Sequence, residues 1–386
     1  MMKNNFIKGI GMTTFGVHSK PSHLLAYDAV YPALEDADMS MNDIDAIVVS
    51  NLEWFYSSER QRHMASQLSA LLKTRIPIIR APGACAGGGN ALWIANKLLK
   101  NDANLNNILV LGVEKLMETT FNSEAILDEF MMAFESKWEQ AEGIHAPCQA
   151  ALTAQAYFNK FPDASTNDLD LIAFKNHSNG ARNPNALFYG RKVSLEEIKN
   201  APIIASPLKL FDCSISADGA AAAVLSRDKA GVELIASANY SDSSSPFERG
   251  DMSTWETTVL SAKEAFSQCG LEPWDMDFYE IHDAFSIVEL ISYEDLGLAK
   301  KGEGAKLIRD KVVCLDGKMP VNPSGGLKAK GHPVSATGLG MVYEIVNQMR
   351  GGAGERQVSN VRKAFAHNIG GTGGVTTANI FKRVGG

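Results

Sequence analysis

The chain has 386 residues and a formal charge of −7, with 45% hydrophobic and 21% charged residues. This length favours two domains, and the composition is that of a folded globular protein rather than a disordered chain. The acidic excess is mild and no block of like charges stands out, so nothing favours binding to nucleic acid or to a membrane surface.

The first half of the chain alternates short β-rich runs with helical patterns. We predict strands at 44–50, 76–81 and 107–113, a helix at 91–100, and a closing strand of small residues at 218–226. Alternation of this kind predicts an α/β fold, with a parallel or mixed sheet covered by helices.

The second half repeats this order of elements. The predicted strands and helices are strand 232–238, helix 257–270, a strand beginning 277–285, helix 286–297, helix 336–352, and strands 364–371 and 375–383. The similar order predicts an internal duplication of two α/β halves.

Residues 115–208 differ from both halves, because they include a run rich in Asn, Gly and Arg at 176–192. A segment this long inside an α/β unit is predicted to be an inserted loop subdomain that acts as a lid or binding region. The first half would then comprise residues 1–114 and 209–230, and the second half residues 231–386.

The five cysteines are odd in number and form no C-x-x-C pair, which argues against a disulfide scaffold and a cysteine-based zinc site. We therefore predict no metal site. The N-terminal run is not apolar enough for a signal peptide, and no stretch approaches a membrane span. We expect a soluble, cytoplasmic protein.

Two segments place chemically useful side chains next to helix starts. In PGACAGGG, Cys85 lies in a glycine-rich turn before a helix, where N–H groups can stabilise a thiolate or an oxyanion. The alternative is a small buried residue at a close packing point. In GHPVSATG, His332 precedes a helix and is a candidate general base; the alternative is an exposed turn histidine.

Two further segments lie at predicted strand ends. HDAF brings His282 and Asp283, although such residues also occur as a core histidine and a helix cap. HNIGGTGG frees backbone N–H groups for a ligand, or simply connects two strands tightly. Together, one thiol, two histidines and two glycine-rich turns are what Claisen chemistry on a thioester requires.

At these motifs the sequence resembles the thiolases over essentially its whole length. GACAGG around Cys85, GGLKAKGHPVSATG around His332 and DGAAAAVL look like family signatures, while HDAF, NHSNGARNP and HNIGGTGG resemble sterol-carrier-protein-type and archaeal acetoacetyl-CoA thiolases. The resemblance implies the layered α-β-α-β-α thiolase fold. It also implies an acetyl-CoA C-acyltransferase that makes or cleaves a 3-ketoacyl-CoA, with acetoacetyl-CoA the expected product.

The resemblance also implies roles for individual residues. Cys85 would be the acylated nucleophile, His332 its activating base, and His282 a donor to the thioester oxygen in a first oxyanion hole shared with His332. The backbone N–H groups of Cys85 and Gly370 would form a second oxyanion hole. The coenzyme A thioester is the substrate, with no covalently bound cofactor. Candidate coenzyme A contacts are His177, Arg182, Arg191, Lys192, Ser324 and Gly325.

One departure from the family concerns proton transfer. Thiolases carry a second catalytic cysteine at the position of Asn368, or in sterol-carrier-type members at that of Ala284. Since neither is present, we predict that His282 also serves as the enolising acid/base. The alternatives are acyl transfer to another acceptor, retro-aldol cleavage of a sterol-type CoA thioester, and a non-catalytic acyl-CoA-binding scaffold.

The resemblance further implies assembly. We expect a homodimer or a dimer of dimers. Archaeal relatives also form a complex with 3-hydroxy-3-methylglutaryl-CoA synthase and a small OB-fold, zinc-ribbon protein, and such a complex is an expectation for this chain.

Overall fold

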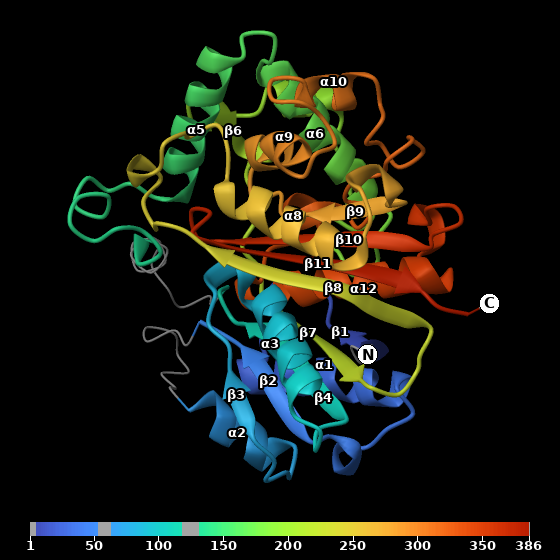
Figure 1. Cartoon of the computed structure of the whole chain (residues 1–386). Helices are drawn as coiled ribbons and strands as arrows, with labels where there is room; N and C mark the ends of the chain where they lie inside the picture. The colour runs from blue at the N-terminus through green and yellow to red at the C-terminus, as the bar shows by residue number, and fades with distance from the viewer. Residues whose placement is uncertain (1–4, 53–62, 118–130, 386) are drawn as a thin grey trace.

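A computed structural model describes residues 5–52, 63–117 and 131–385 (Figure 1). Its main sheet has nine strands in the order β3-β2-β4-β7-β1-β8-β11-β10-β9. The strands are β1 (Asn5–Met12), β2 (Ala46–Ser50), β3 (Ile78–Arg80), β4 (Asn107–Glu114), β7 (Gly219–Ser226), β8 (Val232–Ser241), β9 (Phe278–Ile281), β10 (Lys363–Gly370) and β11 (Val375–Arg383).

The strand order confirms the predicted duplication. In the first half the order is β2-β4-β7-β1, and in the second half β9-β10-β11-β8. In each half the first pair is parallel and the next two pairs are antiparallel. A short antiparallel pairing of β1 with β8 joins the halves.

Helices form three layers around the two halves of the sheet. Helix α1 (Ser22–Asp36) packs on β1, β4 and β7, and α8 (Glu256–Cys269) packs on β8 and β11. Between them, α3 (Gly87–Asn101) and α12 (Thr337–Arg350) pack on each other and on strands of both halves. The expected α-β-α-β-α layering is therefore observed (Figure 1).

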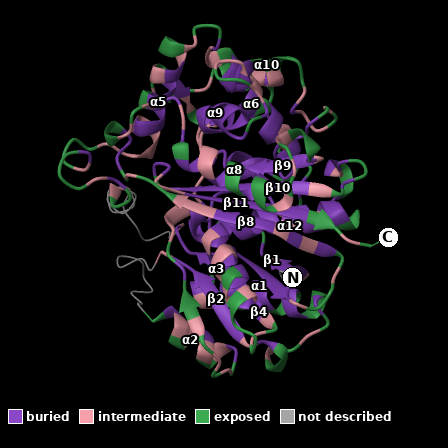
Figure 2. Ribbon diagram, viewed as in Figure 1, coloured by how far each residue is buried: buried purple, intermediate pink, exposed green. Residues whose placement is uncertain are grey.

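The central strands β2, β4 and β7 are buried almost throughout and consist mainly of small and apolar residues, because both of their faces are covered. On β4, Leu109 and Leu111 belong to the core under α1, while Ile108 and Val110 belong to the core around α3 and α12. Figure 2 shows this buried centre as a continuous band. The predicted buried strand at 107–113 is thus confirmed.

Strand β1 was not predicted, because its sequence NFIKGIGM has a lysine and two glycines in place of regular alternation. Both glycines are required because helix α1 packs closely against this strand. A Cβ on Gly9 would lie 2.1 Å from the Ala33 carbonyl oxygen, and one on Gly11 would lie 2.1 Å from that of Ala29. The absence of side chains lets the backbone of α1 approach the strand directly.

In its described part, the inserted segment contains three helices joined by turns and loops; its residues 118–130 lie outside the described ranges. It contains the helices and strands α5 (Ala146–Lys160), α6 (Thr166–Gly180), α7 (Leu195–Lys199), β5 (Ile203–Ala205) and β6 (Leu208–Lys209). Helix α6 packs on α9 (Ser286–Asp295), α10 (Gly304–Arg309) and α11 (Gly326–Lys330) of the second half. Tyr157 and Leu169 share one apolar core with Leu290 of α9.

Candidate active site

The turn that carries Cys85 is held by close backbone packing. It follows β3 as a short 3-10 turn, Ala84–Ala86, and α3 begins directly after it. A Cβ on Gly87 would lie 2.0 Å from the Ser50 hydroxyl, and one on Gly88 would lie 2.9 Å from the backbone of α12. The glycine run therefore seats the start of α3 between β2 and α12, and leaves Cys85 partly exposed.

Three of the predicted residues come together at this turn. The Cys85 thiol and one ring nitrogen each of His282 and His332 lie within 4.8 Å of one another. The two imidazole rings are 5.4 Å apart, centroid to centroid, and nearly edge to face. His282 follows β9 and His332 follows α11, so both histidines are supplied by the second half and the thiol by the first.

The hydrogen bonds of His332 determine which of its nitrogens carries the proton. Its Nδ1 lies 2.7 Å from the Thr337 hydroxyl, and that hydroxyl donates to the Pro333 carbonyl at 3.4 Å. Because the Pro333 carbonyl can only accept, both contacts are satisfied together when the hydroxyl donates to that carbonyl and Nδ1 donates to the Thr337 oxygen. The neutral ring then keeps a lone pair on Nε2, which suits it to accept a proton from the thiol.

Burial outweighs the helix start in setting the charge of the thiol. It raises the pKa of Cys85 from 9.0 to about 11, opposed by a hydrogen bond from the Gly371 N–H. Burial also lowers the pKa of His332 from 6.5 to about 3. The resting pair is therefore neutral thiol and neutral imidazole, and the thiolate expected at the helix start forms only on proton transfer to His332.

Asn368 of β10 links these residues, and sequence reasoning noted it only as the place of a missing cysteine. Its side chain is buried. The amide oxygen accepts from the Gly89 N–H at 3.3 Å, and the amide nitrogen donates to the Cys85 carbonyl at 2.9 Å. The same amide nitrogen lies 3.2 Å from Nδ1 of His282.

The neighbours of Asn368 on β10 face different ways. His367 points away from the site, as strand alternation predicts, and its Nε2 lies 2.9 Å from the Thr258 hydroxyl of α8. A Cβ on Gly370 would lie 2.3 Å from the Gly83 carbonyl oxygen. The absence of a side chain at Gly370 therefore lets β10 pack directly against the turn that carries Cys85. The N–H hydrogen-bonded to the thiol is that of Gly371, one residue beyond the predicted Gly370.

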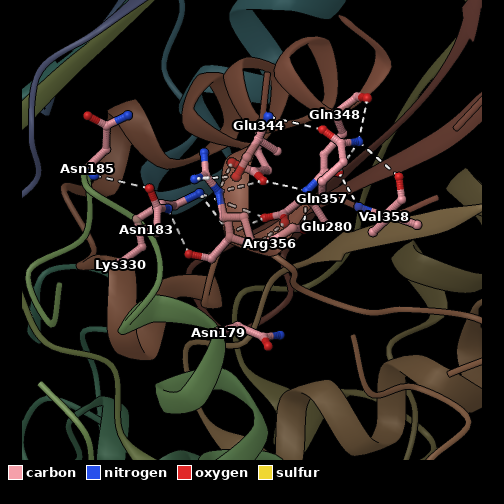
Figure 3. Close-up of polar contacts among 12 residues, drawn as sticks. Asn179, Asn183, Asn185, Glu280, Lys330, Glu344, Gln348, Arg356, Gln357 and Val358 are labelled. Carbon is pink, nitrogen blue, oxygen red and sulfur yellow. Dashed lines mark hydrogen bonds and ion pairs between the residues drawn. The ribbon is translucent and has the colours of Figure 1, made fainter. Parts of the chain in front are cut away.

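Buried charged side chains form a network next to His282. The Asp283 carboxylate accepts from the Leu327 N–H at 2.6 Å and lies 3.5 Å from the Lys328 ammonium group. Lys330 pairs with Glu280 at 3.8 Å, and burial raises the pKa of Glu280 to about 7. Figure 3 also shows a second group of buried contacts, in which Glu344 accepts from Gln348 and from Arg356 at 2.9 Å each. Both lysines belong to the GGLKAKGHP motif, so the positive charges of this motif are buried in the protein interior.

Two predicted coenzyme A contacts belong to this support rather than to a binding surface. The Ser324 hydroxyl is fully buried and donates to the Glu280 carboxylate at 2.6 Å. A Cβ on Gly325 would lie 2.5 Å from the Gly180 Cα, so Gly325 packs against α6.

The four other predicted contacts split into two groups. His177 is buried edge-on to Phe188 and Phe211, and burial lowers its pKa to about 3, so it is not a cation for phosphate. Arg182, Arg191 and Lys192 are exposed. Their exposure is compatible with a phosphate ligand.

A cavity missed by the sequence analysis opens beside the two strand-end loops. His282, Ala284 and Gly371 line one side of it. The rest of its lining includes Phe134, Ala150 of α5, and Met252 and Trp255 of the segment before α8. The regular spacing of Ala146, Ala150 and Thr153 on α5 is the sequence signal that could have indicated one face of a helix.

The thiol and two histidines also form a donor set of the kind that binds zinc. A zinc-bound histidine presents a lone pair to the metal and donates its other N–H outward. At His282 the outward Nδ1 instead faces an amide nitrogen, which is itself a donor. The donor set therefore does not fit a metal. Within the described ranges, it is the one group of three or more His, Cys, Asp or Glu side chains close enough together to hold a metal ion.

Comparison with known proteins places both halves in one family. The thiolase N-terminal domain model matches residues 6–229, and the thiolase C-terminal domain-like model matches residues 238–383. The acetyl-CoA acetyltransferase of Methanothermobacter thermautotrophicus is 36% identical, with 99% of this chain and 100% of that protein covered. Sterol carrier protein 2 of Bos taurus is 31% identical, with 98% of this chain and 72% of that protein covered.

Solved structures show the same fold. An "Ltp2-ChsH2(DUF35) aldolase" superposes with a TM-score of 0.82 at 23% identity, covering 99% of this chain and 98% of that one. Human mitochondrial 3-ketoacyl-CoA thiolase in complex with CoA superposes with a TM-score of 0.74 at 15% identity, covering 100% and 99%. No helix in the described ranges is long and apolar enough to cross a membrane. With both halves matched and a full-length relative at 36% identity, the chain belongs to the thiolase family and is an acyltransferase enzyme.

Proposed function

We propose that this enzyme transfers an acetyl group between coenzyme A thioesters, forming or cleaving acetoacetyl-CoA through an acyl group on Cys85. The observation that carries the proposal is the thiol within 4.8 Å of a ring nitrogen of His332, with a hydrogen bond from the Gly371 N–H to the sulfur. Proton transfer to Nε2 would generate the thiolate that attacks a bound thioester.

The hydrogen-bond donors of the site would form two groups, one for the oxygen of each thioester. The Gly371 N–H, with the backbone N–H groups of Cys85 and Gly370, would bind the oxygen of the acyl group on Cys85. His282 would donate to the thioester oxygen of the second acyl-CoA, while the Nε2 lone pair of His332 would act as the base. Each set supplies donors where negative charge develops during carbon–carbon bond formation.

The test is the two half-reactions measured separately. Intact-mass spectrometry after incubation with acetyl-CoA should show one added acetyl group, mapped by peptide analysis to Cys85. Cys85→Ala should show none, whereas Cys213→Ala, which removes another partly exposed thiol, should behave as the wild type. An unmodified wild-type protein under conditions where acetoacetyl-CoA is made would disprove the acyl-enzyme.

A second candidate is retro-aldol cleavage of a CoA thioester, which requires no acyl-enzyme. It is favoured by Asn368 and Ala284, which leave the two family positions for the second cysteine without a titratable group. Cleavage of a β-hydroxyacyl-CoA without labelling of Cys85 would support it, and acetylation of Cys85 at a rate matching turnover would exclude it as the main activity.

Binding partners are also part of the proposal. Arg182, Arg191 and Lys192 are proposed to contact the phosphates of coenzyme A, which their exposure permits. We further propose self-association into at least a dimer, and assembly with the synthase and the zinc-ribbon protein named above. Analytical ultracentrifugation of the chain alone and after co-expression with those proteins would test both.

A further inference from the structure

We propose that Asn368 is a positioning residue that holds His282 as an N–H donor and leaves His332 as the single imidazole base of both half-reactions. This inference rests on the proposed thiolase function and concerns how its protons move. It replaces the expectation that His282 is the enolising base.

The orientation of the Asn368 amide is determined by its two backbone partners. The Gly89 N–H can only donate, so it requires the amide oxygen, and the Cys85 carbonyl can only accept, so it requires the amide nitrogen. The reversed amide would set donor against donor and acceptor against acceptor inside a buried site. Its NH₂ group therefore faces Nδ1 of His282 at 3.2 Å.

This contact determines the proton position on His282. An NH₂ group cannot accept, so Nδ1 must, and the single proton of the neutral ring lies on Nε2. The ring stays neutral because burial, with the nearby His332, His367 and Lys328, holds its pKa well below the ordinary value. His282 also lines the cavity beside the site. It therefore offers an N–H to a thioester oxygen and has no free lone pair with which to take a proton.

The neighbouring carboxylates are already occupied. Glu114 accepts from the Asn51 amide at 3.1 Å and from the Ser335 N–H at 3.2 Å. Asp283 accepts from the Leu327 N–H and from the Asn176 amide at 2.7 Å. Among the described residues around the thiol, Nε2 of His332 is thus the lone pair suited to proton transfer.

One base is sufficient for the whole reaction. In acylation, Nε2 takes the Cys85 proton, the thiolate attacks the first thioester carbon, and the departing CoA thiolate recovers the proton from the imidazolium. In condensation, Nε2 takes a proton from Cα of the second acyl-CoA, and the resulting enolate carbon attacks the Cys85 thioester. The Cys85 thiolate that is expelled then recovers this proton. Each half-reaction begins and ends with a neutral ring, and the His282 N–H stabilises the enolate oxygen.

The decisive variant is Asn368→Asp, which replaces the donor facing Nδ1 by an acceptor of the same shape. Asn379→Asp is the matched control, since Asn379 is a buried asparagine on β11 whose hydrogen-bond partner is Ser237 rather than a site residue. Nuclear magnetic resonance of ¹⁵N-histidine-labelled protein, assigned with His282→Ala, reports which nitrogen is protonated. We expect Nε2–H on His282 in wild type and control, and Nδ1–H in Asn368→Asp.

The kinetic readouts are single-turnover acetylation of Cys85 and exchange of α-deuterium from acetyl-CoA into water. In Asn368→Asp and His282→Ala we expect exchange to fall by about 100-fold or more, as for a lost oxyanion donor, and by a larger factor than acetylation falls. His332→Ala should lose both. Should Asn368→Asp fold poorly, Asn368→Ala, which removes the donor without adding a charge, gives the kinetic comparison, with exchange expected to fall because Nε2–H is no longer enforced.

Three results would overturn the proposal: Nδ1–H on His282 in the wild type, undiminished exchange in Asn368→Asp after the proton has moved, or undiminished exchange in His332→Ala. Absence of Cys85 acetylation in the wild type would instead refute the proposed function. That outcome is distinguishable, because the proton position on His282 is measured without substrate.

Discussion

The imidazoles of His282 and His332 lie 5.4 Å apart, and the Nδ1 of each ring is held by a different kind of partner. Asn368 donates to the first ring, whereas Thr337 accepts from the second. Two neutral imidazoles in one buried site therefore offer opposite groups to a substrate, an N–H from His282 and a lone pair from His332.

The first prediction concerns Thr337, whose oxygen stabilises positive charge on His332 during proton transfer. Thr337→Val should slow acetylation of Cys85 by about 10- to 100-fold, because a hydrogen bond to a charged group contributes about 1.5–3 kcal/mol. Thr337→Ser keeps the hydroxyl and should retain most of the rate. Equal loss in both variants would show that the methyl group, rather than the hydrogen bond, is required.

The second prediction concerns the reactivity of the thiol. With its pKa raised to about 11, Cys85 should be alkylated faster by about tenfold for each pH unit above neutrality, as the thiolate fraction rises. Peptide mapping after brief alkylation measures this. Cys148 provides an internal comparison, since it lies in the first turn of α5 with His145 Nε2 3.6 Å from its sulfur. A rate at Cys85 independent of pH would contradict the neutral resting thiol.

The third prediction concerns the buried pair of Lys328 and Asp283, whose side chains are both fully buried. Lys328→Met should destabilise the fold by about 3–5 kcal/mol, because it leaves a buried carboxylate without its cation. Lys306→Met removes an exposed ion pair with Glu303 and should cost less than about 1 kcal/mol. Denaturant unfolding of both variants checks this, and similar losses would argue against a structural role for the motif lysine.

The fourth prediction concerns the crossing of α3 and α12. A Cβ on Gly338 would lie 2.3 Å from the Asn368 amide oxygen and 2.4 Å from the Gly89 nitrogen. Gly338→Ala should therefore cost about 1–3 kcal/mol by overpacking and also weaken the hydrogen bond that orients Asn368. Gly231→Ala is the control, because its Cβ would meet no atom within 4 Å. Unfolding free energy and α-deuterium exchange should fall together in Gly338→Ala only.

The fifth prediction concerns acid stability. The pKa of His177 is about 3 in the folded chain, below its ordinary value of 6.5, so between these values the unfolded chain binds a proton that the folded chain does not. Its contribution to stability is complete above pH 6.5 and is lost as the pH falls toward 3. His177→Phe should reduce the slope of unfolding free energy against pH in this window by up to about 1.4 kcal/mol per unit. An unchanged slope would contradict the burial of a neutral ring.

Sequence reasoning succeeded where the signal is local. Apolar runs identified the buried strands, glycine stops identified the ends of α8 and α12, and the repeated order identified the duplication. It failed at β1, where the pattern is set by a helix packed against the glycines, and at His177, whose aromatic neighbours Phe188 and Phe211 come from later segments.

The sequence by itself determined which chemistry is available: a thiol at a helix start, two histidines in loops, glycine-rich turns, and no cysteine at the positions of Asn368 and Ala284. Only the tertiary structure decided how these groups are charged and protonated. The amide of Asn368 meets the Cys85 carbonyl across 283 residues of chain, and this contact sets the proton on His282. Burial by both halves likewise raises the pKa of Cys85. Proton positions and pKa values depend on what surrounds a group, and here the surroundings come from distant parts of the sequence.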